Sequence, residues 1–232
     1  HHATYDRGMD LGITDRVALV VGGTGYLGRH IATTLAAEGA VVVTAGRSGG
    51  DVTIDGQDEA SVVAGVDEVI ARHGRIDILV VTAAPAAQTL DPADAFSPAA
   101  VAAAVDAKSL VFLRLANAVL PHMRARGSGR IIGIAGQLAR SSTSVVASVR
   151  NAALILAAKA LADSVAGTGI TVNVVNPGNV FDDDHPVPAV GPGPSTPEQI
   201  AALVAYLSSE PAAAVSGASI AAGHTFRGVS TL

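Results

Sequence analysis

The hydrophobic and polar positions of the chain follow two patterns that alternate along its length. Short runs of Val, Ile and Leu are typical of strands buried on both faces of a sheet, and longer periodic segments are typical of helices. The runs predict strands at 17–21, 41–45, 52–54, 77–82, 130–135, 170–175 and 218–222. The longer segments predict helices at 26–38, 58–73, 98–124, 145–166 and 198–208. This alternation predicts an α/β fold, a doubly wound parallel sheet of about seven strands.

The connection between the second and third predicted strands is unusually short. Only the residues 45–51 separate Thr44 from Val52, whereas a crossover helix between parallel strands needs about a dozen residues or more. We therefore expect that the helix after the second strand is missing.

Three glycines, at positions 22, 25 and 28, lie between the first predicted strand and the first predicted helix. This spacing is typical of the turn that holds the diphosphate of a dinucleotide against a helix N-terminus. Because a second strand follows, the stretch predicts a Rossmann dinucleotide-binding domain. The residues that we expect to contact the cofactor here are Gly22, Thr24, Gly25, Tyr26 and Leu27. For Tyr26, a packing role at the helix start is the alternative.

Composition narrows the class of protein. Hydrophobic residues make up 49% of the chain and charged residues 15%, so a sizeable core can form. The formal net charge of −5 does not favour nucleic acid as a partner, and we find no 18-residue apolar run that predicts a membrane span. The absence of cysteine excludes disulfides and is compatible with a cytoplasmic protein. Residues 1–10 resemble a tag or disordered terminus, and we expect 11–232 to form a single domain.

The order of motifs resembles the short-chain dehydrogenase/reductase family over nearly all of residues 13–225. The matching segments include Gly74-Arg-Ile-Asp-Ile-Leu-Val, Gly129-Arg-Ile-Ile and Val172-Asn-Val-Val-Asn-Pro-Gly178. The resemblance implies an oxidoreductase that binds a nicotinamide dinucleotide. It places Asp55 beside the adenine and Ala83 after the fourth strand. It places Pro177 and Gly178 next to the nicotinamide.

The end of the second predicted strand indicates which dinucleotide is bound. NAD-preferring relatives carry an acid there, whereas this chain has Gly46 followed by Arg47. A guanidinium can pair with a 2′-phosphate through two hydrogen bonds, and Ser48 could add a hydroxyl contact. NADP(H) is therefore favoured over NAD(H). A solvated loop charge is the alternative for Arg47.

The catalytic positions depart from the family's pattern. The family uses an Asn, a Ser, a Tyr and a Lys, and the resemblance aligns these with Lys108, Gly136, Ala147 and Asn151 respectively. Lys108 and Asn151 look like an exchange of the family's Asn and Lys, and a partly desolvated lysine can act as acid or base. The alternative for Lys108 is a structural pairing with Asp106, Asp182 or a backbone carbonyl.

Two further segments could contact a substrate. Ser144 could bond a substrate oxygen, although a serine at such a turn more often caps the following helix. The proline-rich stretch 179–197 is expected to be a lid, with Val180, Asp182 and His185 facing the substrate. A surface loop with a solvated charge run is the alternative, and the spacing of these residues predicts no metal site.

The predicted helix 145–166 is apolar over much of its circumference and therefore needs a cover beyond the sheet. In relatives this helix forms a dimer seam, so we expect a homodimer or homotetramer.

Three functions remain open from the sequence. The first is the transfer of a hydride between NADP(H) and a small carbonyl, enone or imine substrate, with an atypical proton donor. The second is non-redox chemistry on the same fold, by an isomerase, cyclase or dehydratase. The third is a catalytically silent nucleotide-binding partner, because fold alone does not determine function.

Overall fold

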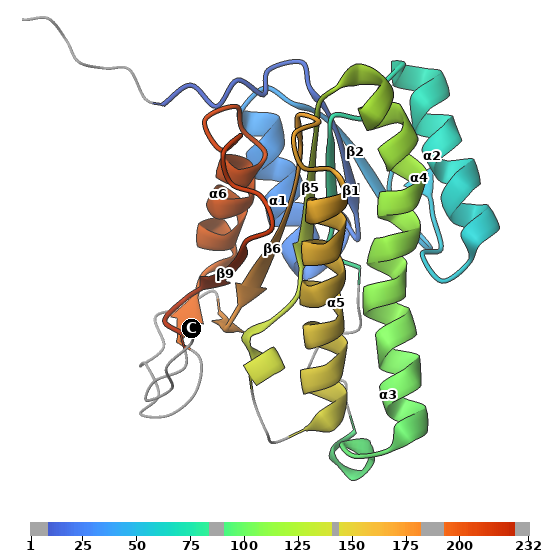
Figure 1. Ribbon diagram of the computed structural model, residues 1–232, viewed down its shortest axis with the longest axis vertical. Coiled ribbons are helices and arrows are strands. Elements are labelled where there is room, and N and C mark those ends of the chain that lie inside the picture. The colour runs from blue at the N-terminus through green and yellow to red at the C-terminus, as the bar shows by residue number, and fades with distance from the viewer. Residues whose placement is uncertain (1–8, 84–90, 141–143, 182–192, 226–232) are drawn as a thin grey trace, which may run out of the picture.

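The computed structural model describes residues 9–83, 91–140, 144–181 and 193–225. A parallel sheet of seven strands forms its centre, in the order β3-β2-β1-β4-β5-β6-β9 (Figure 1). These strands are β1 (Val17–Val21), β2 (Val41–Gly46), β3 (Val52–Thr53), β4 (Ile78–Val81), β5 (Gly129–Ile134), β6 (Ile170–Pro177) and β9 (Ser219–Ala222). The strand order reverses between β1 and β4, which confirms the predicted doubly wound Rossmann sheet.

Helices cover both faces of the sheet (Figure 1). They are α1 (Tyr26–Ala37), α2 (Glu59–His73), α3 (Pro98–Val105), α4 (Val111–Arg126), α5 (Val145–Ser164) and α6 (Pro197–Leu207). In β1, Leu19 and Val21 pack in the core layer under α2, α4 and α5, whereas Ala18 and Val20 pack in the layer under α1 and α6. Because successive strand residues point to opposite faces, this double burial explains the unbroken apolar run of the sequence.

The connection from β2 to β3 contains no helix, as predicted. The five residues 47–51 lie between Gly46 and Val52, yet β3 pairs parallel to β2. Asp51 closes this short loop, because its carboxylate accepts hydrogen bonds from the backbone N–H and the hydroxyl of Thr44, both at 2.8 Å. These hydrogen bonds lower the pKa of Asp51.

The predicted helix 98–124 is interrupted in the structure. A π-helical turn, η3 (Asp106–Leu110), separates α3 from α4. Such turns insert one extra residue into a helix and often occur at functional sites. The interruption was not predicted, because the apolar spacing continues through it.

Helix α5 is long and apolar enough to cross a membrane by length and composition, although the core helix of a globular domain can pass the same test. Leu154, Ala158 and Ala162 of α5 pack in the core, so we interpret α5 as a packed domain helix. Val149 and Leu156 on the same helix are exposed, and the expected homodimer or homotetramer stays a prediction.

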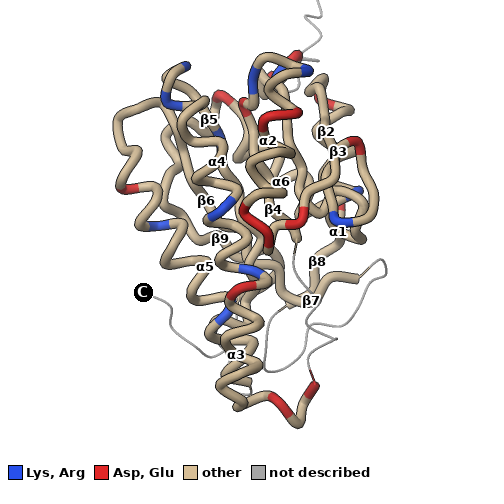
Figure 2. Tube along the Cα trace, turned by 90° about the vertical axis from the view of Figure 1, so that its right-hand side faces the viewer, with Lys and Arg blue, Asp and Glu red and all other residues tan. Residues whose placement is uncertain are grey.

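The amino-terminal edge of the sheet carries a cluster of charges, near the top of Figure 2. Asp77 is buried at its centre, where its carboxylate accepts from the Val17 N–H at 2.8 Å and from two nitrogens of Arg75 at 2.5 and 2.6 Å. Because these bonds join the starts of β1 and β4, this edge has a structural role.

We predict that Asp77→Ala lowers the free energy of unfolding by about 2 to 3 kcal/mol, since it leaves a buried N–H without an acceptor. Chemical denaturation measures the loss. The control is Asp163→Ala, which removes an exposed ion pair with Lys159 and should cost about 0.5 kcal/mol or less. Equal losses of unfolding free energy in the two variants would contradict the structural role of Asp77.

Candidate functional site

A pocket of about 720 Å³ lies at the carboxyl ends of β1, β2, β4, β5 and β6. In a doubly wound sheet, this edge at the reversal of strand order is where ligands bind. All eleven residues predicted to contact the cofactor line the pocket: Gly22, Thr24, Gly25, Tyr26, Leu27, Arg47, Ser48, Asp55, Ala83, Pro177 and Gly178. Lys108 and Asn151 also line it, so the structure brings both halves of the predicted site together.

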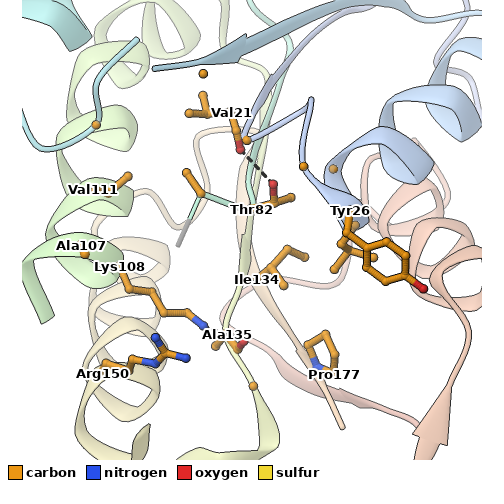
Figure 3. A pocket seen from close by; sticks show the side chains of 18 of the residues that line it. Val21, Tyr26, Thr82, Ala107, Lys108, Val111, Ile134, Ala135, Arg150 and Pro177 are labelled. Carbon is orange, nitrogen blue, oxygen red and sulfur yellow. Dashed lines mark hydrogen bonds between the residues drawn. The ribbon is translucent and has the colours of Figure 1, made fainter. Parts of the chain in front are cut away.

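The glycine turn has the shape that a phosphate cradle needs. Gly22 has a φ of +84°, which favours glycine. A Cβ at Gly28 would lie 2.0 Å from the Gly22 carbonyl oxygen, so only glycine lets α1 approach the turn this closely. Next to the turn, the Thr82 hydroxyl donates to the Val21 carbonyl at 3.1 Å (Figure 3). The N-terminus of α1 therefore opens on the pocket, where it favours an anion.

The opposite end of the pocket is formed by the connections after β2 and β3. Arg47 and Ser48 are exposed there and line the pocket beside Gly46. Asp55 is half-buried, and its carboxylate accepts from the Gln57 N–H at 3.0 Å. A guanidinium and a carboxylate thus line this end of the pocket.

Lys108 occupies the π-helical turn η3 and is only 6% exposed. Its Nζ donates to the Ala135 carbonyl, just after β5, at 2.8 Å. Burial and the neighbouring positive charge of Arg150 lower the pKa of Lys108 to about 7. Lys108 therefore combines the predicted pocket position with one of the alternatives, a bond to a backbone carbonyl.

Arg150 on α5 is a pocket residue that the sequence analysis missed. It is 3% exposed, and its side chain lies next to that of Lys108 (Figure 3). The Ser109 hydroxyl donates to the Arg150 carbonyl at 2.9 Å, which ties the π-helical turn to α5. The signal in the sequence was a single cation within the apolar segment Val145–Ala158.

Asn151 presents an unsatisfied acceptor beside this pair. It is 2% exposed, and its Nδ2 donates to the Ala147 carbonyl at 2.8 Å. Its Oδ1 is buried and has no hydrogen-bond partner among the described residues. A Cβ at Gly136 would lie 3.4 Å from both amide atoms. The wall of the pocket therefore contains a buried acceptor to which none of the described residues donates.

The remaining predicted residues either lie at the margin of the site or fall outside the residues that the structure describes. Ser144 caps α5 by accepting from the Ala147 N–H at 3.2 Å, and it does not line the pocket. Val180 lines the pocket from the short strand β7 (Asn179–Val180), which pairs with β8 (Pro194–Ser195). Asp182 and His185 fall outside the described residues, so the predicted lid stays a prediction. Within the described residues there is no cluster of metal-ligating side chains.

A family model described as short chain dehydrogenase matches residues 16–183. The chain belongs to the short-chain dehydrogenase family of oxidoreductases. This agrees with the resemblance found in the sequence and with the seven-stranded sheet.

Several proteins are similar to this chain over most of its length. The 3-oxoacyl-[acyl-carrier-protein] reductase of Escherichia coli is 32% identical, over 87% of this chain and 93% of its own. The (2S)-[(R)-hydroxy(phenyl)methyl]succinyl-CoA dehydrogenase subunit BbsC of Thauera aromatica is 32% identical over 87% of this chain and 90% of its own. A gluconate 5-dehydrogenase structure from Burkholderia cenocepacia, in complex with NADP and tartrate, has a TM-score of 0.80 at 25% identity and covers 92% of this chain and 96% of its own.

We predict that Lys108 loses its proton near pH 7, because burial and Arg150 disfavour the charged form. The chain has only two lysines, Lys108 and Lys159, so ¹³C-labelled lysine gives two NMR signals that can be followed with pH. Lys108→Arg removes one signal and thereby assigns it. A Lys108 signal that titrates at the ordinary value of 10.5 would contradict the buried geometry.

Proposed function

We propose that the protein is an NADP(H)-dependent reductase of small carbonyl, enone or imine compounds, with Lys108 as its proton donor. The observation that carries the proposal is the buried Lys108 ammonium in the dinucleotide-type pocket, with its pKa lowered to about 7. A general acid works best when its pKa lies near the working pH.

The described residues of the pocket fit a dinucleotide. The glycine turn and the N-terminus of α1 would hold the diphosphate, and Asn151 Oδ1 would accept from a hydroxyl of the nicotinamide ribose. Asn151 would thus replace the hydrogen bonds that the family's lysine makes at this position. Arg47 and Ser48 would contact the 2′-phosphate, which supports NADP(H) over NAD(H).

The proposed reaction needs no group other than the dinucleotide, the substrate and Lys108. A dinucleotide held in this pocket would supply the hydride for the carbonyl carbon of the substrate. Lys108 Nζ gives a proton to the carbonyl oxygen, which yields the alcohol and a neutral lysine that takes its next proton from solvent. Among the described pocket residues, Tyr26 is the sole tyrosine. It lies on α1, across the pocket from Lys108 (Figure 3), so Lys108 is the better placed donor.

One observation favours a second candidate, a catalytically silent subunit. The Thauera aromatica relative is named as a subunit of a dehydrogenase. In this chain, the position that the family fills with its catalytic tyrosine is held by Ala147, which is buried at the start of α5. Such a subunit would bind the dinucleotide but transfer no hydride.

We predict that Arg47→Gln weakens NADPH binding about tenfold, since charged hydrogen bonds to a phosphate contribute about 1.5 kcal/mol or more. NADH binding should stay unchanged because NADH has no 2′-phosphate. Nicotinamide fluorescence measures both affinities. The control Arg124→Gln removes an exposed cation of α4 and should affect neither. Equal weakening of both cofactors by Arg47→Gln would contradict the proposed contact.

We predict that Lys108→Arg lowers hydride transfer about 10²- to 10⁴-fold, the usual effect of losing a general acid. Arginine retains the positive charge but does not release its proton at neutral pH. NADPH oxidation with a panel of carbonyl, enone and imine compounds measures the rate, and fluorescence checks that NADPH still binds. Unchanged turnover in Lys108→Arg would refute the role of Lys108. Tight binding of NADPH without turnover by the wild-type protein would favour the silent subunit.

A further inference from the structure

Lys108 places a buried amine on the wall of a pocket that a small molecule can enter. It lines the cavity of about 720 Å³ together with Ala107, Ala135 and Gly136. These three neighbours carry at most a methyl group, so they leave room for a compact ligand beside the lysine. The Lys108 side chain extends from its helical turn toward Ala135 (Figure 3). The nitrogen therefore lies where a small molecule in the pocket can reach it.

The hydrogen bonding of Lys108 Nζ suits a neutral amine. An ammonium has three N–H groups to donate, whereas a neutral amine has two and a lone pair. Among the described residues, the acceptor for Nζ is the Ala135 carbonyl, at 2.8 Å. Because a buried N–H without an acceptor costs free energy, the ammonium leaves more donors unsatisfied than the amine does. The neutral amine keeps its bond to Ala135 and has a lone pair free to react.

The charged groups of the neighbouring elements do not hold the proton on Lys108. Asp106, in the same turn, accepts from Gln57 Nε2 and from Arg114 of α4, both at 2.8 Å. Helix α3 has no charged residue, and α5 contributes Arg150. Burial and the charge of Arg150 lower the pKa of Lys108 to about 7. A large share of the Lys108 side chains is therefore neutral at physiological pH.

We propose that Lys108 is a nucleophile that forms an imine with small aldehydes and ketones that enter the pocket. Lysines activated by burial or by a neighbouring cation commonly carry out this reaction. The Nζ lone pair attacks the carbonyl carbon, and one proton moves from the nitrogen to the carbonyl oxygen. The resulting hydroxyl leaves as water with the second proton of the nitrogen, and the C=N bond forms. One amine and one carbonyl thus give one imine and one water, without an oxidant or a reductant.

This inference goes beyond the proposed reductase and does not depend on it, because imine formation needs no dinucleotide. The two reactions use different protonation states of Lys108. The ammonium donates a proton to a substrate that is being reduced, whereas the amine attacks a carbonyl carbon. Because the pKa of Lys108 is about 7, the population that can form an imine grows as the pH rises through 7, and the population that can donate a proton shrinks.

The test uses the full chain with propionaldehyde as the probe and no dinucleotide. Sodium cyanoborohydride converts each imine into a stable secondary amine. The chain has two lysines, Lys108 and Lys159, and peptide mapping by mass spectrometry separates both from the amino-terminal amine. Lys159 is the internal control, because it is exposed and forms an ion pair with Asp163. At pH 7 we expect Lys108 to be labelled at least about tenfold faster than Lys159, since exposed lysines are almost fully protonated there.

Two further measurements on the wild-type protein keep the test independent of any variant that fails to fold. The ratio of Lys108 to Lys159 labelling should fall between about pH 7 and 10, because the neutral fraction of Lys108 is nearly complete while that of an exposed lysine still grows. In urea-unfolded protein the ratio should approach one, since unfolding exposes both amines. The matched variant Lys159→Arg should leave the labelling of Lys108 unchanged.

The outcomes separate this inference from the proposed function. Labelling of Lys159 without Lys108, or a labelling ratio that is the same in folded and unfolded protein, would overturn the inference. Selective labelling of Lys108 in a protein that transfers no hydride would support the imine and refute the reductase. Hydride transfer by a protein in which Lys108 is not labelled would support the reductase and refute the imine.

Discussion

Two like charges buried side by side are the constraint around which the site is built. The ammonium of Lys108 and the guanidinium of Arg150 both lose most of their hydration, and the charge of Arg150 further disfavours the charged form of Lys108. The fold offsets part of this cost through the Ala135 carbonyl, which accepts from Lys108 Nζ at 2.8 Å. The rest of the cost lowers the pKa of Lys108 to about 7. The proposed proton donation therefore has its physical origin in the burial of Lys108 beside Arg150.

The surrounding elements hold these two cations in place. The π-helical turn η3 carries Lys108 and Ser109, and the Ser109 hydroxyl joins that turn to α5 at the Arg150 carbonyl. On the other side, Asp106 links the same turn to Gln57 in the connection after β3. The position of Lys108 is thus coupled through hydrogen bonds to both ends of the pocket. The charged edge around Asp77 lies at the opposite ends of the strands, so stability and the proposed chemistry occupy different edges of the sheet.

The sequence predicted the fold well because the apolar runs of a parallel sheet are long and regular. The strand positions, the missing helix and the glycine turn follow from local patterns and short connections. The resemblance to the family, by contrast, placed Asp55, Ala83, Pro177 and Gly178 at the pocket. Arg150 and the π-helical turn could not be predicted in the same way. The burial of Arg150 depends on the packing of α5 against η3, and an extra helical residue at Asp106–Leu110 leaves no mark in the spacing of apolar positions. Ser144 was a candidate for a substrate contact because its residue type suits catalysis. In the structure its hydroxyl caps α5 instead.

The pH dependence of hydride transfer in single turnover tests the central claim most directly, namely that Lys108 gives the proton. We expect a rate that is highest where Lys108 is protonated and that falls as the pH rises through the pKa of Lys108 in the complex. That pKa is about 7 in the free pocket. In Lys108→Arg the residual rate should not follow this profile. A wild-type rate that stays constant from about pH 6 to 10 would contradict a proton donor of this kind.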